Sequence, residues 1–398
     1  GAIFAAWPLV YATAFSGFYF AMLLALFALF FRPVGFDYRS KIENPTWRSL
    51  WDWGLFAGGA VPALVFGVAF GNLLQGVPFQ YDEFLRPTYT GSFWGLLNPF
   101  ALLSGVVSLS MLVMHGAVWL QLRAAEPIES RARGAVKIAA WVLIASFATA
   151  GLWLAWGIDG YRILSMPDAG ALPNPLAKSV ETAAGAWLAN YDSYPWMMAA
   201  PALGFAGALL TWLLSAARRP GWAFVTSALA MTGVILTAGF SMFPFVMPSS
   251  TALNSGLTVW DAPSSHLTLT VMFWAAMIFV PIILGYTTWT YAKMWRRVSV
   301  EEIRSQVEGE TTVLHLVPDG SVVEKGDLLL ELAGREHRLF TAVAVVGGWL
   351  IGEILWSVRA HPVVAAVVAV TGTVVLLDAE GAVVDVSCVV PVVVLEFC

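Results

Sequence analysis

Seven long apolar runs constrain this chain more than any other feature of its sequence. A helix needs roughly 20 residues to cross a hydrocarbon core about 30 Å thick. Lipid offers the backbone no hydrogen-bond partner, and the runs are too long for barrel strands, so the pattern predicts an all-α, multi-pass membrane protein. The predicted spans are Ile3–Phe31, Gly54–Leu74, Phe100–Leu122, Ala135–Gly157, Trp196–Leu214, Trp222–Val246 and Leu267–Tyr291.

Composition supports this fold class and excludes others. The chain is 59% hydrophobic and 12% charged, whereas a soluble domain carries about 25% charged residues. A net charge of -5, with basic residues only in short clusters, argues against a nucleic-acid partner. Both cysteines, Cys388 and Cys398, lie near the C-terminal end, so the sequence offers no cysteine-rich metal pattern and no disulfide framework.

Basic residues alternate between rich and poor connections along the chain. Because such residues favour the cytoplasmic side, the alternation places Gly1 outside and the C-terminal tail in the cytoplasm. The stretch FRPVGFDYRSK, Phe31–Lys41, is then predicted to be a cytoplasmic loop. The basic residues of the rich connections are Arg32, Arg39, Lys41, Arg48, Arg123, Arg131, Arg133, Arg218, Arg219, Lys293, Arg296 and Arg297.

The middle of each span is free of Asp, Glu, Lys and Arg, although pumps and coupled transporters need ionisable groups there. His115 is the one clear exception, and a hydrogen-bonded packing role is favoured over a haem or proton ligand. A bis-histidine haem needs a second histidine at similar depth, and His266 opens the last span at the opposite side. A stand-alone secondary transporter is the alternative, since glycine and proline interrupt several spans.

Four long segments occur in the order found in one known family, and together they cover about Gly1–Val300. The chain resembles subunit II of the cytochrome bd-type quinol oxidases. The segments are FFRPVGFDYRSKIENPTWRSLWDWG (Phe30–Gly54), GVAFGNLLQGVPF (Gly67–Phe79), GIDGY (Gly157–Tyr161), and AGFSMFPFVMPSS with LTVWDAPSSHLTL (Ala238–Leu269).

The resemblance implies a bacterial inner-membrane complex that oxidises quinol and reduces dioxygen to water. In that family the haems b and d and the quinol-oxidising site belong to subunit I, so this chain is expected to be a non-haem companion with no catalytic or metal residues of its own. Family members usually begin with another helix and a polar loop, which implies that the natural chain starts ahead of Gly1. Whether a small third subunit joins, or a quinone or lipid binds this chain, stays open.

Arg32, Asp37 and Arg39 are the candidate site residues. In one reading Asp37 is a solvated loop residue paired with Arg39 or Arg32, an arrangement of little energetic weight when exposed. In the other, these residues line the cytoplasmic mouth of a proton route or hold the subunit interface, because a basic residue at the membrane boundary can extend its charge into water.

Other polar positions are predicted to be structural. Asp261 suits a turn or a helix cap. Asn72 and Gln75 are placed to form hydrogen bonds across helices. Pro244 is expected to bend its helix, and the sequence WDWG, Trp51–Gly54, is expected to be a packing element.

The tail differs in composition from the predicted bundle at 1–297. A charged linker is expected at 298–311, and a valine-rich, β-rich extension at 312–398. Two stretches share a hairpin-like centre, TVLHLVPDGSVVE at Thr312–Glu324 and TVVLLDAEGAVVD at Thr373–Asp385. The segment DGSVVEKGDLLLEL weakly resembles half of a biotinyl or lipoyl domain. However, no lysine stands at a hairpin tip in the Met-Lys-Met or Asp-Lys-Ala sequence that these modifications use. An appended interaction domain and a non-native extension both fit.

Overall fold

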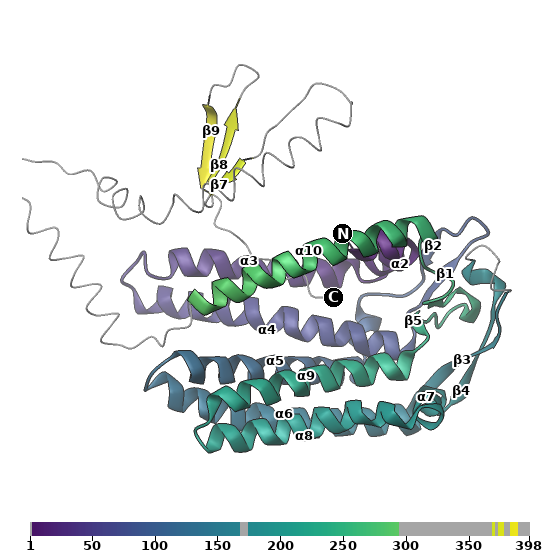
Figure 1. The fold of residues 1–398 in the computed structure, drawn as a ribbon, viewed down its shortest axis with the longest axis horizontal. Helices are drawn as coiled ribbons and strands as arrows, with labels where there is room; N and C mark the ends of the chain where they lie inside the picture. Colours follow the sequence, from purple (N-terminus) through teal and green to yellow (C-terminus); the bar gives the residue numbers. More distant parts are fainter. Residues whose placement is uncertain (1, 168–173, 294–367, 371–372, 378–382, 389–398) are drawn as a thin grey trace, which may run out of the picture. The chain divides into compact units, whose positions relative to one another are not determined.

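The computed structural model describes residues 2–167, 174–293, 368–370, 373–377 and 383–388. The chain divides into two units, Gly1–Gln306 and Val307–Cys398. Among its described residues, the first unit contains seven helices that are long and apolar enough to cross a membrane (Figure 1), which confirms the predicted fold class. These helices are α3 Tyr19–Tyr38, α4 Pro45–Gln75, α5 Pro99–Arg123, α6 Ile128–Gly157, α8 Ala199–Ala216, α9 Pro220–Met242 and α10 His266–Lys293.

Four of the helices form a closed bundle in which α5 packs on α6, α6 on α8, α8 on α9 and α9 on α5. Helix α4 packs on α5, and α3 on α4 (Figure 1). Gly67 lets α4 approach the carbonyl of Ser104 on α5, where any Cβ would collide, and close approach of this kind holds helices together in lipid. The core of the bundle includes Met114, Val118, Val136, Leu143 and Ala208.

The first predicted span is not one helix. The run Ile3–Phe31 is divided into α1 Ala2–Ala6, α2 Pro8–Gly17 and the start of α3. The break before α2 falls at Pro8, since proline has no backbone N–H and disfavours helical geometry in the preceding residue. The Thr13 hydroxyl hydrogen-bonds the phenol of Tyr81, so α2 is held against the strands rather than extending α3.

Three two-stranded antiparallel ribbons and the short helix α7, Ala189–Ser193, occupy one end of the bundle, which we call the strand end (Figure 1). We call the other end, where α3 ends and α4 begins, the basic end. The ribbons pair β1 Phe79–Tyr81 with β2 Pro87–Tyr89, β3 Asp159–Ser165 with β4 Ser179–Ala184, and β5 Phe245–Met247 with β6 Leu257–Thr258.

Helix α9 ends at Met242, so Pro244 lies beyond the helix and does not bend it as the sequence predicts. The amide of Asn190, on α7, donates to the carbonyls of Phe240 at 2.8 Å and Phe243 at 2.6 Å. Side-chain donors of this kind satisfy carbonyls that lose their partners where a helix ends. The helix thus ends just before Pro244, which disfavours helical geometry in Phe243, and Asn190 satisfies carbonyls left without helical partners there.

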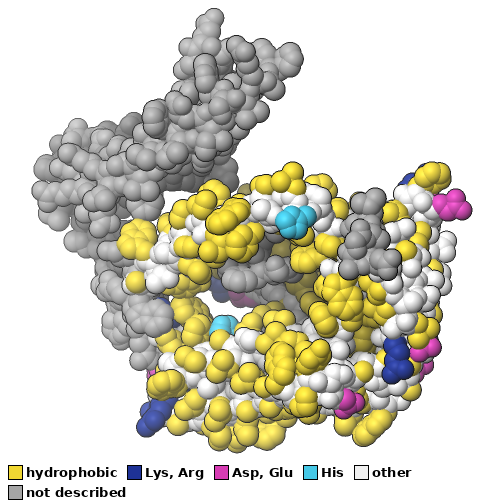
Figure 2. Space-filling model, turned by 45° about the vertical axis from the view of Figure 1, so that its right-hand side comes forward, with side chains coloured by type: hydrophobic (Ala, Val, Ile, Leu, Met, Phe, Trp, Pro, Cys, Tyr) yellow, Lys and Arg dark blue, Asp and Glu magenta, His cyan; other side chains and the backbone are white. Residues whose placement is uncertain are grey.

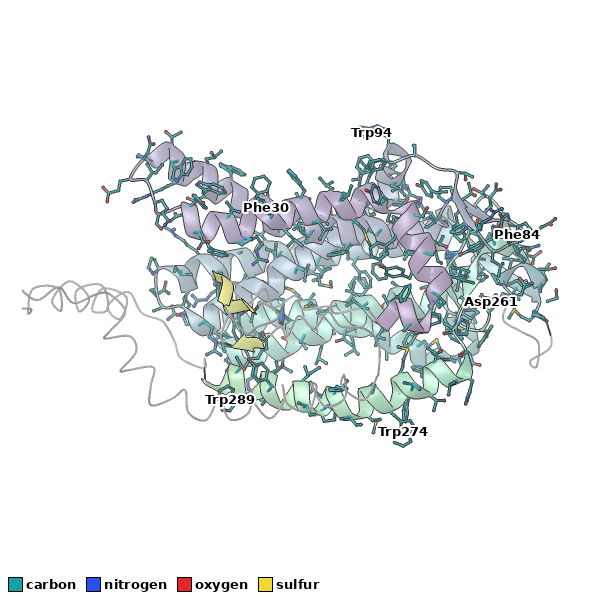
Figure 3. The ribbon with its side chains drawn as sticks, turned by 90° about the horizontal axis from the view of Figure 1, so that it is seen from above. Phe30, Phe84, Trp94, Asp261, Trp274 and Trp289 are labelled. Carbon is teal, nitrogen blue, oxygen red and sulfur yellow. The ribbon has the colours of Figure 1, made fainter. Side chains whose placement is uncertain are left out.

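Helix α10 differs from the other spans because no side chain in its apolar stretch is buried. Trp274 projects away from this helix in Figure 3 and is 61% exposed. The face shown in Figure 2 is mostly hydrophobic, with few charged side chains. Such a surface is suited to lipid or to another membrane subunit.

The second unit contains an antiparallel sheet in the order β7 Val368–Val370, β8 Thr373–Leu377 and β9 Val383–Cys388. The antiparallel pairing of β8 with β9 agrees with the β-structure predicted at Thr373–Asp385. The predicted linker at 298–311 and the first hairpin at Thr312–Glu324 lie outside the described residues. The predicted domain boundaries stay predictions.

Candidate functional site

At the basic end, Arg39 follows α3 directly and binds Asp52 on α4. Arg39 Nε donates to Asp52 Oδ1 at 2.5 Å, and Nη2 donates to Oδ2 at 3.2 Å. The two parallel bonds give a bidentate pair with fixed orientation. The side chains are 45% and 52% exposed, so water competes with the pair and its contribution to stability is small.

Aromatic contacts explain why α3 continues to this point. The Tyr38 ring stacks on Trp51 with centroids 6.2 Å apart, and Trp47 Nε1 donates to the Tyr38 carbonyl at 2.8 Å. Helix α4 begins at Pro45, where the Asn44 side chain accepts from two backbone N–H groups. The predicted loop FRPVGFDYRSK is therefore wrong for its first part, because Phe31–Tyr38 is helical.

The structure separates the three predicted site residues. The Arg32 side chain packs against Gly58 of α4. A Cβ added to Gly58 would lie only 2.8 Å from Arg32 Cγ. Asp37 and Lys41 line one open cavity of about 530 Å³ beside Trp47. Pairing of Asp37 with the Arg39 guanidinium is wrong, since that guanidinium binds Asp52 from the neighbouring helix.

A second ion pair lies at the strand end and is almost completely buried. Lys178 Nζ is 2.6 Å from Asp261 Oδ2, and the two side chains are 0% and 2% exposed. Lys178 Nζ also donates to the Pro175 carbonyl at 2.8 Å, and Asp261 Oδ1 accepts from the Thr258 N–H at 2.8 Å. Burial lowers the pKa of the Lys178 ammonium, and the Asp261 carboxylate opposes this change.

Asp261 (labelled in Figure 3) thus joins the α9–α10 connection to the connection between α6 and α7. Its Oδ1 contact is a turn interaction, as one sequence reading predicts. The first turn of α10 is capped by Ser265 instead, whose Oγ accepts from the Thr268 N–H at 3.3 Å.

Side chains from the α6–α7 connection also satisfy the last carbonyls of α4. Trp187 Nε1 donates to the Leu74 carbonyl at 2.9 Å, and the Tyr161 phenol donates to the Gln75 carbonyl at 3.1 Å. Burial raises the pKa of Tyr161 to about 12, which keeps the phenol a neutral donor at ordinary pH. Both contacts fix the end of α4 to the strand end.

Asn72 forms the predicted contact beyond its own helix. Its Nδ2 donates to the carbonyls of Val68 and Leu96, each at 2.8 Å, and its Oδ1 accepts from Asn98 Nδ2 at 3.1 Å. Asn98 is the N-cap of α5, so the contact links α4 to the start of the next span. Gln75 takes part through its backbone carbonyl only, as described above.

His115 occupies a packing position. Its Nδ1 is 2.8 Å from the Ser227 hydroxyl, and its ring centroid is 4.7 Å from that of Phe224. Within the described parts of the chain, no cluster of three or more His, Cys, Asp or Glu residues could hold a metal ion. His115 and His266 do not suit a bis-histidine haem site, because His115 lies within α5 whereas His266 is the first residue of α10, at the strand end.

Comparison with known proteins decides the family. The family model for cytochrome bd terminal oxidase subunit II matches residues 1–294. The chain belongs to this family. It is 57% identical over 303 residues to the cytochrome bd-I ubiquinol oxidase subunit 2 of Escherichia coli K12, covering 76% of this chain and 80% of that protein. The Bacillus subtilis cytochrome bd ubiquinol oxidase subunit 2 is 31% identical over 306 residues, with the same coverage.

A solved bd oxidase from Geobacillus thermodenitrificans overlaps 70% of this chain and 74% of its own, at 14% identity and a TM-score of 0.46. This subunit II is part of a cytochrome bd-type quinol:oxygen oxidoreductase complex. The comparisons give no support to the secondary transporter alternative.

Two charged residues of this subunit II escaped sequence reasoning. Asp52 lies in the WDWG segment, between two tryptophans and close to a basic connection. That position was the one sequence signal that could have indicated an ion pair. Lys178 stands in a connection poor in basic residues, and no local pattern marks it as buried. Its partner comes from a distant connection, so only the fold brings the two charges together.

Proposed function

We propose that this subunit II is a non-haem scaffold for subunit I, which carries haems b and d and the quinol-oxidising site. The proposal places the complex in the bacterial inner membrane, with the basic end and the C-terminus in the cytoplasm. The main support is that His115, the half-buried histidine of the described spans, already has a hydrogen-bond partner in the Ser227 hydroxyl. The chain alone is then expected to have no oxidase activity.

The exposed faces of α10 and α3 are the proposed surface for subunit I. At the strand end the Ser264 N–H, just before α10, donates to the Ala6 carbonyl at 2.8 Å. At the basic end the ring centroids of Tyr291 and Trp119 are 5.9 Å apart. Between these contacts no side chain of α10 is buried, and on α3 both Phe27 and Phe30 are more than 60% exposed. Packing against another subunit would bury these side chains.

Arg32, Asp37 and Arg39 are proposed to work at the basic end of this interface. The Arg39–Asp52 pair holds the ends of α3 and α4 together, and this positions Asp37 beside the open cavity it shares with Lys41. An aspartate and a lysine at a membrane boundary can exchange protons with water or contact charged groups of subunit I. The proposed role is the entrance of a proton route or a polar subunit contact.

The test uses the complete oxidase with Asp37→Asn in this chain. We expect a lower yield of haem-bearing subunit I on copurification, or a lower rate of proton uptake during turnover of the oxidase in vesicles. Asp192→Asn is the matched control, because Asp192 is an exposed aspartate at the strand end. An isolated subunit II that carries haem would contradict the scaffold proposal. Equal assembly and proton uptake in both variants would remove Asp37 from it.

A further inference from the structure

An apolar cavity of about 420 Å³ lies between α3, α4, α5 and the short helix η1, Trp94–Leu97. Its volume falls in the range of small-molecule sites, about 300–1,000 Å³. We call it the slot. Side chains that line the slot include Ala21, Leu24, Phe56, Leu64, Val68 and Leu109.

The slot offers a ligand no free hydrogen-bonding group. Asn72 is its one polar lining side chain, and both ends of the amide are engaged. Its Nδ2 donates to two carbonyls, those of Val68 and Leu96, and its Oδ1 accepts from Asn98. An occupant therefore gains only by burying apolar surface, which requires a hydrocarbon chain.

A second cavity of about 430 Å³ adjoins the slot and has a different character. The two share Phe93 and Leu96 as lining residues, so they lie next to each other at η1. We call the second cavity the mouth. Its polar side chains are all hydroxyl-bearing, namely Ser16, Tyr19, Tyr89 and Ser92.

Trp94 indicates the depth of the mouth in the membrane. It belongs to η1, whose residues line the slot and the mouth, and it is 77% exposed. Trp94 projects outward from the helices in Figure 3. Exposed tryptophans of membrane proteins concentrate at the headgroup level. The mouth thus lies where lipid ester groups lie, and the slot extends into the hydrocarbon region.

We propose that the slot and mouth bind one membrane phospholipid, with an acyl chain in the slot and its glycerol ester oxygens at the mouth hydroxyls. No Asp, Glu, His, Lys or Arg lines either cavity. A quinone that exchanged protons at this site would need such a group, whereas ester carbonyls need only hydroxyl donors. The absence of lining charges also predicts no selection by headgroup charge. The site is independent of the scaffold function proposed above.

The experiment places the whole oxidase in vesicles of phosphatidylethanolamine and phosphatidylglycerol that contain a phosphatidylethanolamine with a diazirine in one acyl chain. After irradiation, mass spectrometry locates the labelled peptides. We expect labels on the slot-lining residues Phe56, Leu64 and Leu109, with equal yield when phosphatidylglycerol carries the diazirine. Labelling no stronger than on other lipid-facing helix surfaces would overturn the proposal.

A filled slot provides the second measurement. Ala60 lines the slot, so Ala60→Phe is expected to reduce slot labelling several-fold while haem content stays unchanged. Ala145→Phe is the control, because Ala145 is exposed on α6 away from the slot, and it is expected to label as the wild type does. Undiminished labelling in Ala60→Phe, or an isoprenoid quinone recovered from the slot in place of phospholipid, would refute the inference.

Discussion

One ion pair at each end of the bundle, Arg39–Asp52 at the basic end and Lys178–Asp261 at the strand end, can be compared directly, because the two have nearly equal N···O distances and opposite burial. Arg39 and Asp52 approach to 2.5 Å with side chains 45% and 52% exposed. Lys178 and Asp261 approach to 2.6 Å with side chains 0% and 2% exposed. Distance alone therefore does not tell what an ion pair contributes. Burial decides it, because water can replace a lost partner only at the exposed pair.

The difference in burial also gives the two ion pairs different expected roles. The exposed pair stands beside the proposed interface, where its charges remain available to water or to subunit I. The buried pair fastens two connections whose charges have no other partners of opposite sign in the described contacts. We expect the first to matter for assembly or proton movement and the second for folding.

The largest effect is expected from Lys178→Met, which leaves the Asp261 carboxylate buried without its cation. Breaking a buried pair in this way costs about 3–5 kcal/mol. The change is measured as a loss of apparent unfolding free energy of the purified oxidase in detergent. Arg39→Met is the control at the exposed pair, and equal losses in the two variants would break the comparison.

Asn72→Leu tests a contact that is buried but neutral. The substitution removes a hydrogen bond from the carbonyl of buried Leu96 and another from the half-buried Asn98 amide. An unsatisfied buried group costs about 1–3 kcal/mol. Ser146→Ala is the matched control, since Ser146 bonds only carbonyls of its own helix. A thermal shift equal to that of the control would show that the link to α5 is not stabilising.

The double variant Lys178→Met, Asp261→Leu removes both buried charges at once. Replacing a buried pair by apolar residues is often neutral, so we expect it to recover most of the stability lost in Lys178→Met. The recovery is read as the coupling energy of a double-mutant cycle. A double variant as unstable as the sum of its single variants would show that the two charges act independently.

The smallest change in stability is expected for Asp52→Asn, because both members of this pair are well exposed to water. Its effect should also vanish at about 1 M salt, where the screening length falls to about 3 Å. The melting temperature at low and high salt is the measurement. A large, salt-independent loss would mean that another subunit covers this end of α3 and α4.

Sequence reasoning placed the spans well and misjudged their ends. Helix α5 was expected at Phe100–Leu122 and is found at Pro99–Arg123. By contrast, the first run was expected to be continuous, but it breaks before Pro8 and again between α2 and α3, and the contact of Thr13 with Tyr81 holds α2 against the strands. A proline inside an apolar run is ambiguous on its own, because α3 and α4 contain Pro33 and Pro62 without breaking.

The candidate site shows the same limit. The sequence singled out Arg39 as charged and near the membrane boundary, but it offered Asp37 as the partner because Asp37 is close along the chain. The structure pairs Arg39 with Asp52 instead, since α3 and α4 are antiparallel neighbours and Asp37 remains on α3. For Arg32 and Asp37 the proposed roles remain predictions.

By itself, the sequence determined the membrane fold, the family and the basic character of one end of the bundle. Hydrophobicity and charge act locally, because the bilayer responds to each segment as it stands. Tertiary structure alone decided the partners of Arg39 and Lys178, the division of the first run, and the cavities beside η1. These features depend on which distant segments meet, and packing of the whole chain sets that.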